Sequence, residues 1–167
     1  DADARVQRFV EKPAPGTEPS NLANAGTYVL EASVLDRIPV GQKTSIERIT
    51  FPAIVADGRL FAHATDDYWI DTGKPDLYLQ ANLDLVTGVR PGHACEPVAS
   101  GALVDPSATL IDSVVDHGAT IAAGARVDHA VVLAGAVIEA NALVVRSSVM
   151  GRVEQGASII DCVIGAD

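Results

Sequence analysis

A repeat in the second half of the chain constrains its fold more than any other feature. Four stretches of seven residues each begin with an aliphatic residue, carry alanine at the fifth position and end on another aliphatic residue. They start at Val104, Ile121, Ile138 and Val153, which gives spacings of 17, 17 and 15 residues. A helical period does not produce this pulse, whereas short strands that turn corners in a parallel β-helix do.

The residues between these stretches support the same interpretation. An aliphatic pair such as Val114 and Val115 follows each stretch, and we expect a small residue before the pair to fit the bend of the coil. We assign Ser113, Ala130, Ser148 and Cys162 to that corner position. The pattern resembles the hexapeptide-repeat family of left-handed β-helices over about 65 residues.

Aromatic residues divide the chain into two parts. All seven lie within the first 78 positions, so the second part has a core that admits aliphatic side chains but not rings. Proline and glycine gather between the two parts, which is typical of a linker. We therefore expect three regions: a first domain over 1–88, a linker over 89–97 and a β-helix over 98–167.

The first part reads as an α/β layer structure. Residues 5–10, 24–30 and 59–64 have the composition of strands, and residues 75–87 have the pattern of a helix that starts with proline and stops before Gly88. Thr44 and Glu47 have the spacing of a capping box, which predicts the start of a further helix at Thr44.

Composition excludes several classes of protein. The 167 residues carry a net charge of −10, with 12 lysines and arginines against 22 acidic residues, which argues against a nucleic-acid partner. No apolar run is long enough to cross a membrane, and residues 1–5 do not resemble a signal peptide. Two cysteines do not make a disulfide scaffold, so we expect a cytoplasmic protein.

Four polar residues and one glycine in the first part could together bind a phosphorylated sugar and a metal ion. Lys12 offers a positive charge to a phosphate, Glu11 accepts from hydroxyl groups, and Asn24 both donates and accepts. Gly26 leaves room for a ligand, and Asp71 is a hard oxygen ligand of the kind Mg²⁺ prefers. Taken singly, the same residues could form a charged turn at 11–12, a plain turn at 24–26 and a helix cap at Asp71.

Four motifs together resemble one family, the sugar-nucleotide pyrophosphorylases. They occur in that family's order and spacing: Phe-Val-Glu-Lys-Pro at 9–13, Asn-Ala-Gly-Thr-Tyr-Val-Leu at 24–30, Thr-Ser-Ile-Glu at 44–47 and Tyr-Trp-Ile-Asp-Thr-Gly-Lys-Pro at 68–75. The resemblance implies a Rossmann-like nucleotidyltransferase domain, of which this chain holds the C-terminal half, followed by a left-handed parallel β-helix.

The resemblance also implies roles for these five residues. Lys12 would meet the phosphate of a sugar 1-phosphate, Glu11, Asn24 and Gly26 would hold the sugar, and Asp71 would bind the catalytic Mg²⁺. Lys12 and Asp71 would be the catalytic residues. The motifs are most similar to those of members that convert mannose 1-phosphate and GTP to GDP-mannose and pyrophosphate.

Three motifs of that family do not occur in the sequence. They are the Gly-rich loop with its arginine, the downstream Pro-Lys pair and the Gly-Asp whose carboxylate shares the metal. We therefore expect a fragment of a longer enzyme, one that starts after the nucleotide-binding half, stops within the repeats and is inactive alone.

Three alternatives stay open at this point. The first is an enzyme of the same family that makes a glucose nucleotide. The second is an acyltransferase of the hexapeptide type, for which His117 and His129 are the candidate bases. The third is an assembly module, and we expect residues 98–167 to form a homo-oligomer whatever the chemistry of the first part.

Overall fold

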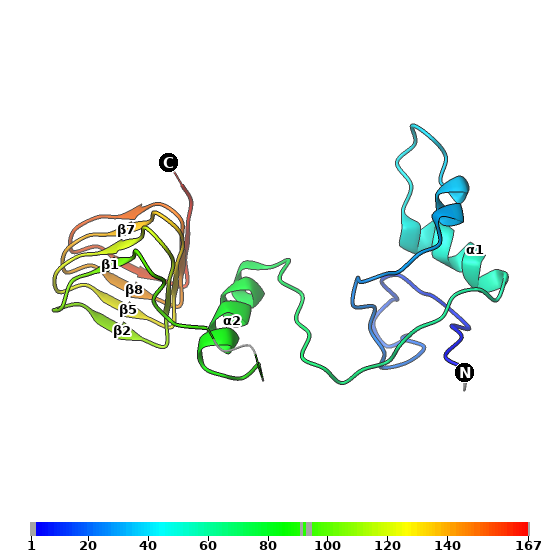
Figure 1. The fold of residues 1–167 in the computed structure, drawn as a ribbon, viewed down its shortest axis with the longest axis horizontal. Coiled ribbons are helices and arrows are strands. Elements are labelled where there is room, and N and C mark those ends of the chain that lie inside the picture. The colour runs from blue at the N-terminus through cyan, green and yellow to red at the C-terminus, as the bar shows by residue number, and fades with distance from the viewer. Residues whose placement is uncertain (1–2, 91, 93–94, 167) are drawn as a thin grey trace. The chain divides into compact units, whose positions relative to one another are not determined.

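The computed structural model describes residues 3–90, 92 and 95–166 (Figure 1). The chain forms two compact units, Asp1–Asp67 and Tyr68–Asp167, and each is described here by itself. Of the expected linker, residues 91, 93 and 94 lie outside the described residues. The boundaries 1–88, 89–97 and 98–167 stay a prediction.

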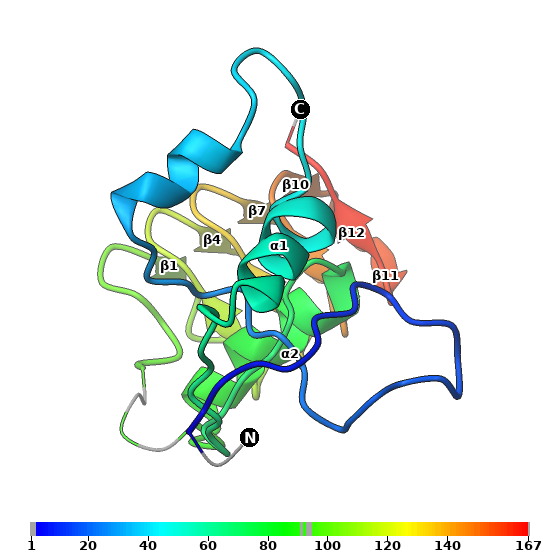
Figure 2. The same cartoon turned by 90° about the vertical axis from the view of Figure 1, so that its right-hand side faces the viewer.

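Residues 103–164 form the parallel β-helix that the repeat predicts. Its strands are β1 Leu103–Val104, β2 Thr109–Ile111, β3 Val114–Val115, β4 Thr120–Ile121, β5 Arg126–Asp128, β6 Val131–Val132, β7 Val137–Ile138, β8 Leu143–Val145, β9 Ser148–Val149, β10 Arg152–Val153, β11 Ser158–Ile160 and β12 Val163–Ile164. They make three sheets with the orders β1-β4-β7-β10, β2-β5-β8-β11 and β3-β6-β9-β12. Figure 2 shows the first of these sheets with its strands side by side.

The register of the strands explains the repeat. Val104 pairs with Ile121, Ile121 with Ile138, and Ile138 with Val153, so the four starting residues form one column. Ile121 and Ile138 are buried in the core together with the alanine and the seventh residue of their own stretches, and the same positions of the first and last stretches pack against this core and are partly buried. Each coil therefore contributes the same few aliphatic groups, and the core has no place for an aromatic ring.

One corner assignment is wrong. Strand pairing sets Ser148 opposite Val131 and Val163, and these residues lie on the outer side of their sheet, not at the corner. The corner residue of that coil is Ser147, whose hydroxyl donates to Val145 O (2.7 Å) and accepts from Cys162 N (3.0 Å). The spacing of the repeat also indicates Ser147, which lies three residues after Val144 as Ser113 lies three residues after Leu110.

Helix α2, Pro75–Val86, forms where the sequence predicts it. Proline occupies the first turn, where its missing N–H has no intrahelical partner to lose, and Gly88 has the left-handed φ of 76° that ends such a helix. Leu83 is its most buried apolar residue, and the helix packs against the outer side of β3 and β6. Val131 of β6 is only 1% exposed as a result.

The first unit contains short helices and no strand among its described residues. The helices are η1 Ala32–Arg37, η2 Ile46–Thr50 and α1 Phe51–Ala56. The strands expected at 5–10, 24–30 and 59–64 are therefore wrong for this structure. Among the residues of this unit that the structure describes, β-pairing is limited to an antiparallel bridge between Arg5 and Phe61. A strand needs a neighbour to satisfy its backbone groups, whatever its composition.

The start of the helical segment is one residue later than the capping-box spacing predicts. Ser45, not Thr44, is the N-cap of η2, and its hydroxyl accepts from Arg48 N at 3.2 Å. The helix continues into α1, whose Phe51 is fully buried and packs edge-to-face with Phe9 and Tyr28. This aromatic cluster is the core of the first unit.

We predict that Ile138→Ala destabilises the β-helix by about 2–5 kcal/mol, because it opens a cavity in a core that cannot collapse around it. Thermal or urea unfolding of the chain measures the loss. Ile160→Ala is the matched control, since Ile160 is 48% exposed where Ile138 is fully buried. An equal loss of unfolding free energy in the two variants would show that the column containing Ile138 is not the core of the β-helix.

Candidate functional site

Glu11 and Lys12 form an exposed turn in the first unit. Lys12 has a left-handed φ of 52°, and its ammonium lies 3.9 Å from Glu11 Oε1. The Lys12 side chain is 78% exposed, whereas that of Glu11 is 21% exposed. The Lys12 ammonium is therefore accessible to an anion from solution. This exposure is compatible with a charged turn and with a phosphate-binding site.

Asn24 and Gly26 form a second turn in the same unit. Gly26 N donates to Asn24 Oδ1 at 3.0 Å, and Gly26 has a φ of 73°, a conformation that other residues adopt with strain. Apart from Gly26 itself and its two neighbours in the chain, no heavy atom of the described residues lies within 4 Å of the place where a Cβ on Gly26 would stand. The turn is therefore open on that side and leaves room for a ligand.

Sequence reasoning missed two members of this cluster. Asn24 Nδ2 donates to the Tyr28 hydroxyl (2.6 Å) and to Glu47 Oε1 (3.2 Å), and the Tyr28 hydroxyl donates to the same Glu47 oxygen (3.2 Å). Tyr28 and Glu47, the two missed residues, belong to motifs that carry the family resemblance. No spacing in the sequence indicates that Glu47 contacts Asn24, which lies 23 positions away.

Asp71 belongs to the second unit and does not cap α2. Its Oδ1 accepts from Gly73 N at 2.9 Å, which closes a turn of its own. The N-cap of α2 is Lys74, whose side chain makes no capping hydrogen bond. The helix-cap interpretation of Asp71 is therefore wrong.

The segment that carries Asp71 is tied to α2 by a buried carboxylate. Asp84 is 6% exposed, and it accepts from the Tyr68 hydroxyl and from Gln80 Nε2, both at 2.6 Å. The hydrogen bond to Asp84 raises the pKa of Tyr68. Both oxygens of the buried carboxylate are thus paired, and Tyr68 anchors the chain three residues before Asp71.

The donor set around Asp71 fits Mg²⁺ only together with a substrate. Within residues 3–90, 92 and 95–166, no three His, Cys, Asp or Glu side chains come together to hold a metal ion. A single exposed carboxylate is still compatible with Mg²⁺, because that ion commonly uses one or two carboxylates and completes its shell with water and substrate phosphates.

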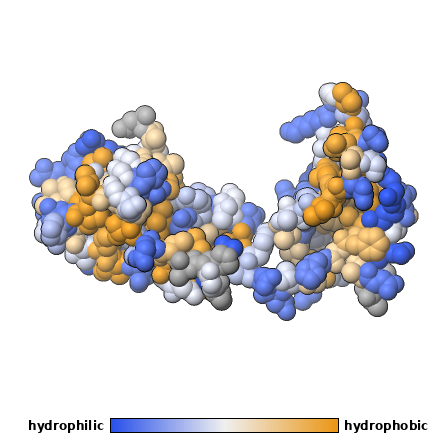
Figure 3. All heavy atoms as spheres, viewed as in Figure 1, coloured by the Kyte–Doolittle hydropathy of each residue, from blue (hydrophilic) through white to orange (hydrophobic). Residues whose placement is uncertain are grey.

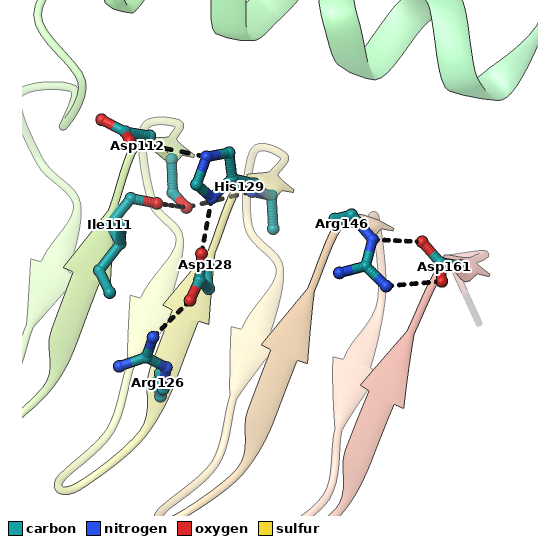
Figure 4. Close-up of polar contacts among 9 residues, drawn as sticks. Ile111, Asp112, Arg126, Asp128, His129, Arg146 and Asp161 are labelled. Carbon is teal, nitrogen blue, oxygen red and sulfur yellow. Dashed lines mark hydrogen bonds and ion pairs between the residues drawn. The ribbon is translucent and has the colours of Figure 1, made fainter.

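The two histidines of the β-helix are engaged with carboxylates, and Figure 4 shows the contacts of His129. His129 Nδ1 lies 2.6 Å from Asp128 Oδ1, and its Nε2 lies 3.6 Å from Asp112 Oδ2. His117 Nδ1 lies 3.1 Å from Asp116 Oδ1 in an exposed turn. A general base needs a ring nitrogen that is free to take a proton from substrate, and the contacts of His129 leave it less suited to that role.

His129 belongs to a column of polar corner residues, with Asp112, Arg146 and Asp161. All four have positive φ, from 38° at Asp112 to 54° at Asp161. The Arg146 guanidinium makes a bidentate pair with the Asp161 carboxylate: Nε donates to Oδ1 at 2.7 Å and Nη2 donates to Oδ2 at 2.8 Å. This pairing lowers the pKa of Asp161 and raises that of Arg146.

Comparison with known proteins identifies the class. Residues 1–88 match the family model described as nucleotidyl transferase, which is more than half of the 167-residue chain. The chain therefore belongs to the nucleotidyl transferase family, with a nucleotidyltransferase region at its N-terminus followed by a parallel β-helix of about four coils.

Three of the curated relatives carry names of the same kind. The mannose-1-phosphate guanylyltransferase of Mycobacterium tuberculosis is 40% identical over 157 residues, which cover 87% of this chain and 43% of the relative. The mannose-1-phosphate guanyltransferases of Schizosaccharomyces pombe (37% identical) and Aspergillus fumigatus (38%) match over 115 residues each, 65% and 64% of this chain and 31% of either relative. This chain thus spans less than half the length of these relatives.

No described helix is long and apolar enough to span a membrane.

We predict that Asp161→Asn removes part of the acid dependence of β-helix stability. Because the folded-state pKa of Asp161 is lowered, its contribution is present above the ordinary carboxyl pKa of about 3.9 and is lost as the pH falls through the folded value. Unfolding curves should therefore separate wild type from variant near neutral pH and converge in acid.

The matched control is Glu154→Gln, a carboxylate of the β-helix for which the described residues provide no ion-pair partner. Its unfolding should follow wild type at every pH. A constant difference between Asp161→Asn and wild type down to the most acidic buffer would contradict the ion pair as the cause.

Proposed function

We propose that this chain is part of a sugar-1-phosphate nucleotidyltransferase that converts mannose 1-phosphate and GTP to GDP-mannose and pyrophosphate. The observation that carries the proposal is the set of exposed turns at 11–12, 24–26 and 71–73, which present an ammonium, an amide and a carboxylate in a chain of this family. The names of its relatives support mannose and guanine as the sugar and the base.

In this reaction a phosphate oxygen of the sugar 1-phosphate attacks the α-phosphorus of the nucleoside triphosphate. The bond to the β-phosphate oxygen breaks, and pyrophosphate leaves. Lys12 neutralises charge on the sugar phosphate, while Glu11, Asn24 and the backbone at Gly26 hold the sugar. Asp71 would hold Mg²⁺, which supplies charge neutralisation at the phosphates. Positioning and charge, not a covalent step on the protein, provide the rate enhancement.

We further propose that the β-helix assembles the enzyme into a homo-oligomer in the cytoplasm. Figure 3 shows apolar side chains on the outer surface of this region, and Leu103, Ile160 and Val163 are each about half exposed or more. An uncovered aliphatic surface favours association. The domain boundaries 1–88, 89–97 and 98–167 form part of this proposal.

Two other activities are weaker candidates. A glucose-nucleotide enzyme of the same family uses the same chemistry, and a comparison of rates with mannose 1-phosphate and glucose 1-phosphate separates the two. Acetyl transfer that depends on His117 or His129 would support the acyltransferase, but the carboxylate contacts of both rings disfavour it.

We predict that Asp71→Asn, in the longer enzyme that contains this chain, lowers turnover by orders of magnitude and leaves the fold intact. Asparagine can still accept from Gly73 N, but it has no charge with which to hold Mg²⁺. A pyrophosphate-release assay at several Mg²⁺ concentrations measures the effect. Asp76→Asn, an exposed aspartate in the first turn of α2, is the control, and near-normal turnover of Asp71→Asn would refute the metal role.

We also predict that the 167-residue chain alone releases no pyrophosphate above background from GTP, mannose 1-phosphate and Mg²⁺. Its sequence contains neither the Gly-rich loop that cradles the triphosphate nor the Gly-Asp motif of the second metal carboxylate. The longer enzyme serves as the positive control. Steady turnover by the purified chain would show that those motifs are dispensable.

A further inference from the structure

Glu47 lies in η2, a helical segment separate from the turn that contains Asn24. Ser45 caps η2 through Arg48 N, which fixes the backbone on both sides of Glu47. From there Glu47 Oε1 accepts two hydrogen bonds, one from Asn24 Nδ2 and one from the Tyr28 hydroxyl, each 3.2 Å long. A carboxylate accepts and does not donate, so only a donor can face it.

The contacts of Asn24 leave its amide little freedom. An asparagine amide has two N–H groups and two acceptor sites on its oxygen. Nδ2 donates to the Tyr28 hydroxyl and to Glu47 Oε1, which we assign to one N–H each, while Oδ1 accepts from Gly26 N. Both donors are thus used, and the remaining capacity is one acceptor site on Oδ1. Turning the amide over would set its oxygen against the Glu47 carboxylate and its NH₂ against Gly26 N–H.

The core of the unit holds this arrangement. The Tyr28 ring packs edge-to-face on Phe51, with 4.8 Å between ring centroids, and Phe51 is fully buried. Phe51 begins α1 directly after η2, the segment that carries Glu47. The phenol therefore approaches Asn24 from the aromatic core, and the carboxylate approaches it from the helical segment that leads into Phe51.

We infer that Glu47, together with Tyr28, is a positioning residue that sets the Asn24 amide so that Asn24 accepts a hydrogen bond from a sugar hydroxyl and does not donate one. The inference rests on the proposed function, because it takes Asn24 as a sugar-binding residue. Glu47 acts through Asn24, and its negative charge matters only as a partner for donors.

The test compares Glu47→Ala, Glu47→Gln and Tyr28→Phe in the longer enzyme. Without the carboxylate the amide turns freely, and loss of one well-placed hydrogen bond raises the KM for mannose 1-phosphate about tenfold. The KM for GTP stays unchanged. Glu47→Gln restores a KM within about threefold of wild type, since its amide oxygen still accepts from Asn24. Tyr28→Phe, which frees one N–H of Asn24, raises the KM by a smaller factor than Glu47→Ala.

A second readout does not depend on activity. In ¹⁵N-labelled wild type the two side-chain amide protons of Asn24 exchange slowly with water, and in Glu47→Ala they exchange at the rate of exposed asparagines. Glu18→Ala, an exposed glutamate without a described side-chain contact, is the matched control and leaves both readouts at wild-type values.

Three results would overturn the inference. The first is an unchanged KM for mannose 1-phosphate in Glu47→Ala, and the second is a Glu47→Gln enzyme as impaired as Glu47→Ala. The third is a Glu47→Ala enzyme in which the KM for both substrates rises and thermal stability falls. The second would assign the charge itself to the ligand, and the third would make Glu47 merely structural. A wild-type enzyme that does not use mannose 1-phosphate would refute the proposed function instead, and amide exchange would still report on Asn24.

Discussion

Parallel backbone pairing between successive coils is the constraint on which the second unit depends. Once Val104, Ile121, Ile138 and Val153 are stacked in register, each coil has the same narrow interior, and each column admits one kind of side chain. Alanine and small corner residues follow from the lack of space, and aromatic residues are excluded by it. The outer sides of the sheets are free to vary, and there α2 finds an apolar surface on β3 and β6.

The first unit obeys a different rule. It has no sheet among its described residues, and its candidate binding residue Asn24 is held by a short-range hydrogen bond from Gly26 N. Asp71 of the second unit is held in the same way, by Gly73 N. Such turns preset the direction of a polar side chain at little energetic cost. The aromatic cluster around Phe51 then supplies the rigidity that a sheet would otherwise give, and its member Tyr28 carries the hydroxyl that donates to Glu47.

Periodic features were predictable and contextual ones were not. The β-helix columns and α2 follow from patterns that local chemistry enforces, since spacing and proline placement leave few alternatives. The prediction of a strand at 5–10 was wrong because a strand forms only with a paired neighbour, and composition does not show whether a neighbour is present. Ser148 is not the corner residue, because it lies one position beyond the spacing of the repeat and Ser147 makes the corner hydrogen bonds. Asp71 fits a helix cap in sequence, but its carboxylate accepts from Gly73 N instead.

The sequence by itself determined the β-helix, the position of α2 and the membership of the chain in a family whose motifs it carries in order, because each depends on residues close together or regularly repeated. Tertiary structure alone decided which groups face one another. Glu47 meets Asn24 across 23 positions, and Arg146 meets Asp161 across a coil. Contacts of this kind depend on where the backbone returns after a turn, and no local preference of the residues encodes that return.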